Sequence, residues 1–185
     1  NSHKSKNVDS KIITLQHAEL ISKWIDKLDI TDNLNTSYEF KLMLRGSRDG
    51  FASSKFHEIC DDQFYTVAVV KVKNSNEIIG GYNPIEWKND ERSYGITKDS
   101  FIFSFENADN IEKYVLSRVK DEKFAIFNLR SCGPLFGEYG EDFAVWGDNF
   151  YNKSYCKKRS YEKKIRNTDS CFSVEEFEVF KLLKK

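Results

Sequence analysis

The sequence has few residues that interrupt secondary structure, with 2 prolines and 9 glycines among its 185 residues. It also lacks any run of about eighteen apolar residues, so we expect no membrane insertion. Basic and acidic side chains balance at 29 each, which gives no overall field that would attract nucleic acid or an anionic membrane. The polar N-terminal stretch NSHKSKNVDSK has no apolar segment of the kind found in secretory signals.

The 4 cysteines are scattered along the chain and form no C-x-x-C pair. Zinc sites usually bring their ligands in close pairs, and small secreted disulfide scaffolds carry more cysteine. The nearest approach to a metal pair is His57 with Cys60, but ordinary helix packing is the favoured interpretation of these two residues. The composition therefore predicts reduced thiols in a cytoplasmic protein, with no metal and no cofactor.

The aromatic content of 15% and the length predict a folded domain with a substantial core. We expect residues 1–10 to be a polar linker or tail and residues 11–185 to form the domain. A helix is predicted over residues 14–29, with Thr14 as its N-cap and an apolar stripe that includes Ile21 and Trp24. A second short helix is predicted over residues 53–60, capped by Ser53 or Ser54.

The rest of the pattern is typical of β-strands. Tyr38, Phe40, Leu42 and Leu44 alternate with other residues, which predicts that all four lie on one face of a strand. Further strands are predicted at residues 64–72, 78–82, 100–105, 123–129, 142–146 and 175–182, the first two joined as a hairpin. No long helices lie between them to make parallel crossovers. We therefore expect an α+β, mainly β fold: a sandwich of two antiparallel sheets with short helices at its margin.

The stretch LRGSRDGFASSKFHEICD, which begins at Leu44, concentrates polar residues at a strand-to-helix junction. It allows an enzyme or redox site centred on His57, Glu58 and Cys60. A structural interpretation also accounts for it. Gly46 and Gly50 would supply positive φ angles, Asp49 would form an Asx-turn, and Arg45 or Arg48 would bind a buried carboxylate.

Two later stretches also carry charge. Glu138, Glu141 and Asp142 cluster beside several glycines, and we interpret them as a solvated acidic loop. The segment from Lys153 to Arg166 is rich in lysine, with tyrosines interleaved as on some nucleic-acid-binding surfaces. A basic loop that keeps an edge soluble is the simpler interpretation, and docking of an acidic protein partner is the main functional one. The candidate docking residues are Lys157, Lys158, Arg159 and Lys163.

Several motifs, taken in chain order, resemble the TLDc domain, which is found at the C-terminus of oxidation-resistance proteins. They are LRGSRDGFASSKFHEICD, IIGGYNPIEW, SFIFSF, CGPLFGEYGEDFAV and the closing VEEFEVF, and they span residues 10–180. The matching residues are Arg45, Gly46, Ser47, Asp49, Gly50, Phe51, Phe56, His57, Gly80, Gly81, Tyr82, Trp87, Gly133, Pro134, Phe136, Gly137, Glu178 and Phe180. The sequence DQFYT stands where the family often has Gly-Pro-Thr before the central strand.

The resemblance implies a two-sheet fold and a role in protection from oxidative damage, and some members bind the V-type proton ATPase. It brings no agreed catalytic mechanism, so we assign no catalytic residues. Three hypotheses follow. The first is a non-catalytic protein-interaction module, with V-type ATPase subunits as candidate partners. The second is an enzyme or redox protein centred on His57. The third, which the balanced charge disfavours, is nucleic-acid binding through residues 153–166.

Overall fold

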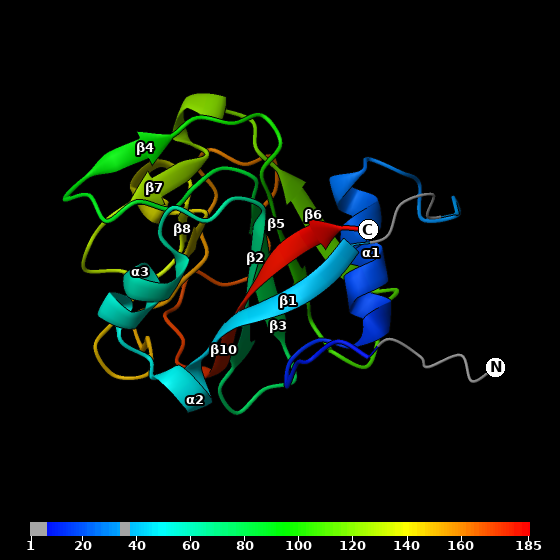
Figure 1. Ribbon diagram of the computed structural model, residues 1–185, viewed down its shortest axis with the longest axis horizontal. Helices are drawn as coiled ribbons and strands as arrows, with labels where there is room; N and C mark the ends of the chain where they lie inside the picture. Colours follow the sequence, from blue (N-terminus) through cyan, green and yellow to red (C-terminus); the bar gives the residue numbers. More distant parts are fainter. Residues whose placement is uncertain (1–6, 34–37) are drawn as a thin grey trace.

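The computed structural model describes residues 7–33 and 38–185 (Figure 1). Its helices are α1 (Leu15–Ile25), α2 (Gly46–Asp49) and α3 (Ser53–Cys60), with 3-10 turns η1 (Glu122–Phe124) and η2 (Glu138–Gly140). Its strands are β1 (Tyr38–Arg45), β2 (Thr66–Val72), β3 (Ile78–Asn83), β4 (Ser93–Gly95), β5 (Phe101–Phe105), β6 (Tyr114–Arg118), β7 (Ile126–Asn128), β8 (Leu135–Phe136), β9 (Phe143–Ala144) and β10 (Val174–Lys184).

The strands form two antiparallel sheets, as the sequence predicted. The larger sheet has the order β1-β10-β2-β3-β5-β6 and the smaller one the order β4-β7-β8-β9. β2 and β3 form the expected hairpin, and β10 lies between β1 and β2, so the first and last strands are neighbours in one sheet. The fold is mainly β, with short helices around the sheets.

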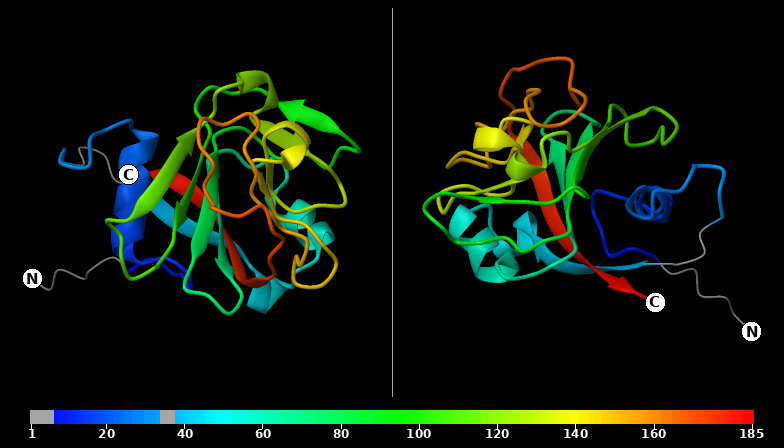
Figure 2. Two further views of the ribbon diagram at one scale, coloured as in Figure 1. Left: turned by 180° about the vertical axis from the view of Figure 1, so that it is seen from behind. Right: turned by 90° about the horizontal axis from the view of Figure 1, so that it is seen from above.

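The core lies on both faces of the larger sheet. Side chains such as Val70 and Ile102 pack between the two sheets, together with Phe136 and Phe143 of the smaller one. The opposite face packs against α1, whose Trp24 ring lies 5.4 Å from the Phe103 ring, centroid to centroid. Figure 2 shows α1 on one side of the larger sheet and α2 and α3 on the other. α1 therefore covers a sheet face, which the prediction of helices at the margin did not include.

Two glycines allow the layers to approach. A Cβ atom on Gly80 would lie 2.4 Å from Cζ of Phe103, on the α1 side of the sheet. A Cβ atom on Gly81 would lie 2.4 Å from Cζ of Phe136, which belongs to the smaller sheet. Consecutive residues of a strand point to opposite faces, so this pair makes room for one aromatic ring on each side.

Strand β1 departs from the predicted alternation. Phe40 and Leu42 pack on the α1 side, whereas Leu44 is fully buried in the core between the sheets. The register with β10 shifts between Leu42 and Leu44, which marks a β-bulge. Since an extra residue reverses the direction of all later side chains, the prediction that all four residues share one face is wrong for Leu44.

The first helix begins as predicted, with Thr14 as its N-cap, but it ends at Ile25. The cap is a reciprocal box in which the Thr14 amide donates to Nδ1 of His17 at 3.0 Å. Glutamate or glutamine usually fills the His17 position in such a box. Because Nδ1 accepts this hydrogen bond, the box requires the imidazole to be neutral.

We expect this cap to make stability depend on pH. Burial lowers the pKa of His17, against the opposing effects of the Ala108 carbonyl and the Asp109 carboxylate. The unfolded chain therefore takes up this proton first, near pH 6.5, and the contribution to stability present above that pH is lost as the pH falls. In urea unfolding at pH 7.5 and 5.5, the wild type should lose more stability than His17→Gln. Equal losses in the two proteins would contradict the assignment.

Candidate functional site

The residues of the first motif block hold the chain together around β10. Arg45 donates from Nε to Oε2 of Glu178 at 2.7 Å and from Nη2 to Oδ1 of Asp9 at 2.9 Å. Glu178 is fully buried and also accepts from the Ser10 hydroxyl and, at 3.1 Å, from the Lys11 amide. The predicted arginine–carboxylate contact is confirmed for Arg45. It ties the segment before α1 to β1 and β10, so Asp9 and Ser10, which were expected in the tail, contact the domain.

The turn after Arg45 differs in detail from the prediction. Residues 46–49 form a helical turn that is followed by Gly50. A positive φ was expected of both Gly46 and Gly50, but only Gly50 has one, at 99°. Gly46 is needed for space instead, because a Cβ atom there would lie 2.5 Å from the Phe51 ring. Asp49 accepts from the Arg45 amide at 3.0 Å, four residues upstream, and not from the downstream backbone of an Asx-turn. The Ser47 amide donates to Oε1 of Glu176 at 3.0 Å.

His57 is buried and makes structural contacts. Its Nδ1 lies 2.8 Å from Oδ1 of Asp61, and its Nε2 lies 3.1 Å from the Leu129 carbonyl and 2.9 Å from that of Cys132. These contacts join α3 to the loop before β8. Glu58 points away into solvent and pairs with Lys55 at 3.1 Å. The structure therefore does not bring His57 and Glu58 together as an acid–base pair.

The structure also contradicts the predicted N-cap of α3 and the redox alternative for the Cys60 thiol. The N-cap of α3 is Ala52, which makes no side-chain hydrogen bond, so the predicted serine cap is wrong. Cys60 has no exposed surface, and burial raises the pKa of its thiol far above the ordinary value. A thiol that is protonated and inaccessible does not act as a nucleophile, which contradicts a redox role for Cys60.

Among the four cysteines, we expect Cys171 alone to react in the native state. Cys60, Cys132 and Cys156 are buried, and burial raises the pKa of Cys132 to about 11. Native protein treated with DTNB should release about one equivalent of thionitrobenzoate per chain, because one thiol is accessible. The Cys171→Ser variant should release almost none. Rapid reaction of two or more thiols in the native wild type would contradict this assignment.

The second and third motif blocks also serve packing. Tyr82 lies on the α1 side of the sheet, 5.2 Å from the Phe101 ring. Gly133 and Pro134 bond to Val145. The Gly133 amide donates to the Val145 carbonyl at 2.9 Å, and the Val145 amide donates to the Pro134 carbonyl at 3.0 Å. These contacts align the smaller sheet.

Asp142 is buried, so the prediction of a solvated acidic loop is wrong for this residue. Its carboxylate accepts from the amides of Arg159, Ser160 and Tyr161 at 2.9, 2.8 and 3.0 Å. Burial raises the pKa of Asp142, while these three donors act in the opposite direction. Gly137, with φ of 97°, is essential beside it, because a Cβ atom there would lie 1.9 Å from Oδ2 of Asp142.

The Asp142 contacts place the basic segment beside the smaller sheet. Tyr155 and Ala144 form an antiparallel bridge, so the segment runs along β9. The tyrosines that suggested base stacking are Tyr151, Tyr155 and Tyr161. Tyr151 and Tyr161 are fully buried. Two of the three stacking platforms are thus inaccessible, which removes the pattern behind the nucleic-acid hypothesis.

The four candidate docking residues are all exposed, but they lie in two different places. Lys157 lies over the Tyr155 ring, with Nζ 5.1 Å from the centroid, and Lys158 is next to it in sequence. Arg159 pairs with Glu138 at 3.1 Å and with Glu141 at 3.3 Å. The Lys163 backbone bonds to the Ser117 hydroxyl of β6, so Lys163 lies beside the larger sheet, whereas Arg159 lies beside the smaller one.

A second arginine approaches this region from β4. The exposed ring of Tyr139 has the guanidinium carbon of Arg92 4.9 Å from its centroid and that of Arg159 at 5.1 Å. Arg92 also lies 5.8 Å from the Phe127 ring. We call Arg92, Tyr139, Tyr155, Lys157, Lys158 and Arg159 the arginine–aromatic surface, and the buried Phe127 ring lies beneath Arg92.

The fold presents this surface rigidly. Phe127 of β7, Leu135 of β8 and Ala144 of β9 form an apolar layer on the outer face of the smaller sheet. Tyr139 adopts a left-handed φ of 57°, and its amide donates to the Tyr94 hydroxyl at 3.1 Å. Backbone strain of this kind is common at functional sites.

Sequence reasoning identified only part of this surface. The spacing in the basic segment indicated Lys157, Lys158 and Arg159, but Arg92 and Tyr139 lie in separate loops. The sequence GEYGED gives a weak signal for Tyr139, since an aromatic residue between acidic residues and glycines has no place in a core.

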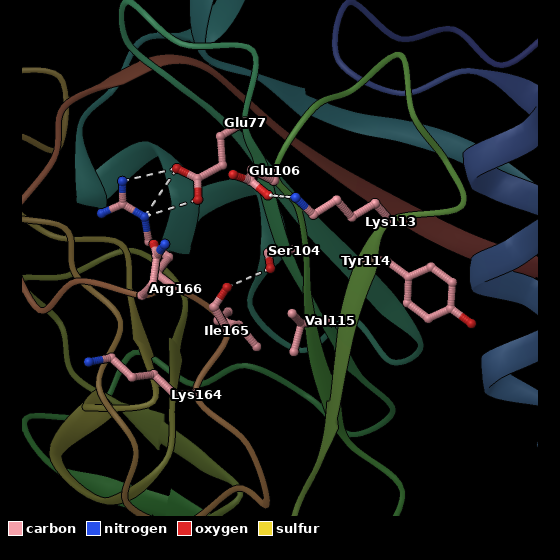
Figure 3. A pocket seen from close by; sticks show the side chains of 10 residues that line it. Glu77, Ser104, Glu106, Lys113, Tyr114, Val115, Lys164, Ile165 and Arg166 are labelled. Atoms are coloured by element: carbon pink, nitrogen blue, oxygen red, sulfur yellow. Dashed lines mark hydrogen bonds and ion pairs between the residues drawn. The ribbon is translucent and has the colours of Figure 1, made fainter.

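A cavity of about 390 Å³ lies elsewhere, between β5–β6 and the segment around Ile165 (Figure 3). Arg166 donates to both oxygens of Glu77, with its Nη2 3.0 Å from Oε1. The Ser104 hydroxyl donates to the Ile165 carbonyl at 2.6 Å. These polar groups bond to one another, so their contacts hold the segment around Ile165 against the sheet.

Within residues 7–33 and 38–185, no three His, Cys, Asp or Glu side chains are arranged so that they could hold a metal ion. None of the helices in the same residues has the length and apolar character needed to span a lipid bilayer. A comparison with curated protein sequences gives no match. The sequence matches the TLDc domain over residues 6–183, nearly its whole length, and the chain therefore belongs to the TLDc domain family.

Proposed function

We propose that this chain is a non-catalytic protein-interaction module that binds the V-type proton ATPase and acts in the cytoplasm. The partner follows from what TLDc domains are known for, and four unpaired cysteines suit a reducing compartment. The observation that carries the proposal is the contrast between two sets of residues. The motif residues Arg45 and His57, which could do chemistry, are held in structural contacts, whereas Arg92, Tyr139, Lys157, Lys158 and Arg159 of the arginine–aromatic surface are exposed.

The residue types of this surface support docking of a protein. Tyrosine and arginine dominate the binding energy of protein interfaces, and Tyr139 lies between two arginines with 45% of its surface exposed. Arg92 and Arg159 flank this ring, and the exposed Lys157 and Lys158 directly precede Arg159 in the sequence, so their positive charge suits an acidic segment of the partner. Protection from oxidative damage would then follow from the partner's activity and not from a reactive thiol of this chain.

The proposal is tested by affinity capture from native lysate. The triple variant Arg92→Glu/Lys157→Glu/Lys158→Glu should keep its fold, since exposed substitutions usually change stability by about 0.5 kcal/mol or less each. It should lose most of the V-type ATPase subunits that the wild type captures. Lys73→Glu, an exposed charge reversal at the end of β2, is the matched control and should capture like the wild type.

Two results would overturn the proposal. One is the absence of ATPase subunits from the wild-type capture. The other is equal capture by the folded triple variant, which would refute docking through the arginine–aromatic surface. Binding to single-stranded nucleic acid that weakens steeply with salt, and is lost in the triple variant, would instead favour the nucleic-acid hypothesis.

A further inference from the structure

The two edges of the larger sheet are not equally protected. At the β6 edge, the Arg118 amide donates to Oε1 of Glu162 at 3.1 Å, and the Arg118 carbonyl accepts from the Glu162 amide at 2.9 Å. At the other edge, β1 has β10 as its one strand partner among the described residues. An uncovered edge strand presents unpaired backbone groups to which another chain can bind.

The register shows which groups of β1 point outward. Leu182 donates its amide to the Tyr65 carbonyl at 2.8 Å, on the β2 side of β10. Phe40 lies opposite Leu182, and backbone direction alternates along a strand, so the N–H and C=O of Phe40 point away from β10. The same holds for Tyr38 and Leu42, two residues to either side. Three residues of β1 thus direct their backbone hydrogen-bonding groups toward the outside of the sheet.

A groove of about 950 Å³ lies beside this edge. It is bounded by α1, by Asn7–Asp9 and by Lys185, and all five residues from Tyr38 to Leu42 line it. Since consecutive side chains point to opposite faces, the groove must border the strand edge itself. The open edge ends at the bulge, where Arg48 donates to the Met43 carbonyl at 3.1 Å.

The side chains of this segment form a self-complementary pattern. In the sequence Tyr-Glu-Phe-Lys-Leu, Glu39 and Lys41 stand on either side of Phe40. Both are exposed, and neither has a hydrogen-bond or ion-pair partner among the described residues. If two copies pair antiparallel with Phe40 opposite Phe40, each Glu39 lies opposite a Lys41. Charges usually protect an edge strand by repulsion, but in this register they attract.

We propose that the Tyr38–Leu42 edge binds the same edge of a second copy of this chain, with Phe40 on the two-fold axis. Phe40 pairs with Phe40, and Tyr38 with Leu42, through their outward backbone groups. The Glu39–Lys41 pairs occupy non-hydrogen-bonded positions, where Cα atoms lie about 4.5 Å apart and side chains are closest. The interface is isologous and joins the two larger sheets into one continuous sheet.

A pairing of five residues per chain is small beside the roughly 1,600 Å² of a standard interface, so the dimer should depend on protein concentration. We would measure it by sedimentation equilibrium of the purified chain from low micromolar to about 0.5 mM. Lys41→Glu and Glu39→Lys each replace two attractive pairs by two repulsive ones. Each should weaken dimerisation about tenfold or more.

The charge swap separates this register from other contacts. Glu39→Lys/Lys41→Glu should restore wild-type dimerisation, and a mixture of the two single variants should form heterodimers. Lys73→Glu, outside the edge, should dimerise like the wild type. A wild type that stays monomeric at about 0.5 mM overturns the proposal. So does a dimer unaffected by the single reversals, or one that the double swap fails to restore.

Discussion

Replacing Arg45 by alanine is expected to lower the free energy of unfolding by about 3–5 kcal/mol. The Arg45 side chain is 13% exposed and its partner Glu178 is 0% exposed, so the substitution leaves a buried carboxylate without its cation. The Ser10 hydroxyl and the Lys11 amide still donate to that carboxylate, but neither carries a neutralising charge against it. Urea unfolding at neutral pH measures the effect.

Arg48→Ala is the matched control for this experiment. Arg48 is in the same turn and pairs with Asp49, but half of its side chain is exposed. Exposed ion pairs contribute about 0–1 kcal/mol, so this variant should remain close to the wild type. Similar small losses in both variants would contradict the view that Arg45 is a structural hub.

Replacing Asp142 by alanine is expected to destabilise the protein by about 3 kcal/mol or more. The change leaves three amides without an acceptor, and each unsatisfied buried group costs about 1–3 kcal/mol. Asp142→Asn should have an intermediate effect, because one side-chain oxygen can still accept from Arg159 and Tyr161, whereas the amide nitrogen would face the Ser160 N–H.

Glu141→Ala serves as the control for Asp142. Glu141 is the neighbouring residue, and its carboxylate pairs with the exposed Arg159 at 3.3 Å. Thermal unfolding should show a small change for Glu141→Ala and a large one for Asp142→Ala. If the two variants unfold at the same temperature, the Asp142 contacts do not hold the basic segment in place.

These expectations show what the sequence can and cannot predict. Periodicity found α1, its Thr14 cap and the long strands, because burial of one face imposes a repeat that is visible in the residues. It did not find the bulge before Leu44, because Leu42 and Leu44 are both apolar and continue the alternation although they face opposite sides of the sheet. It missed β6, where the neighbouring charged residues hide a five-residue strand, and β8, which has two residues.

The candidate site was less predictable than the fold. The sequence predicted a solvated Asp142 because the donors to its carboxylate are backbone amides. Every residue except proline has such an amide, so residue types do not reveal these partners. Similarly, nothing in the residue order brings Arg92 beside Tyr139. The motif residues were easy to find, but Arg45 and His57 proved to be structural, since each is bonded to a carboxylate within the fold.

The central claim is that this TLDc domain works through the arginine–aromatic surface and not through its motif residues. Hydrogen–deuterium exchange of the chain, alone and with purified V-type ATPase, tests this most directly. We predict slower exchange on binding in residues 92–94, 138–141 and 155–159, with residues 44–61 unchanged. Protection confined to residues 44–61, or no protection at a saturating ATPase concentration, would contradict the account.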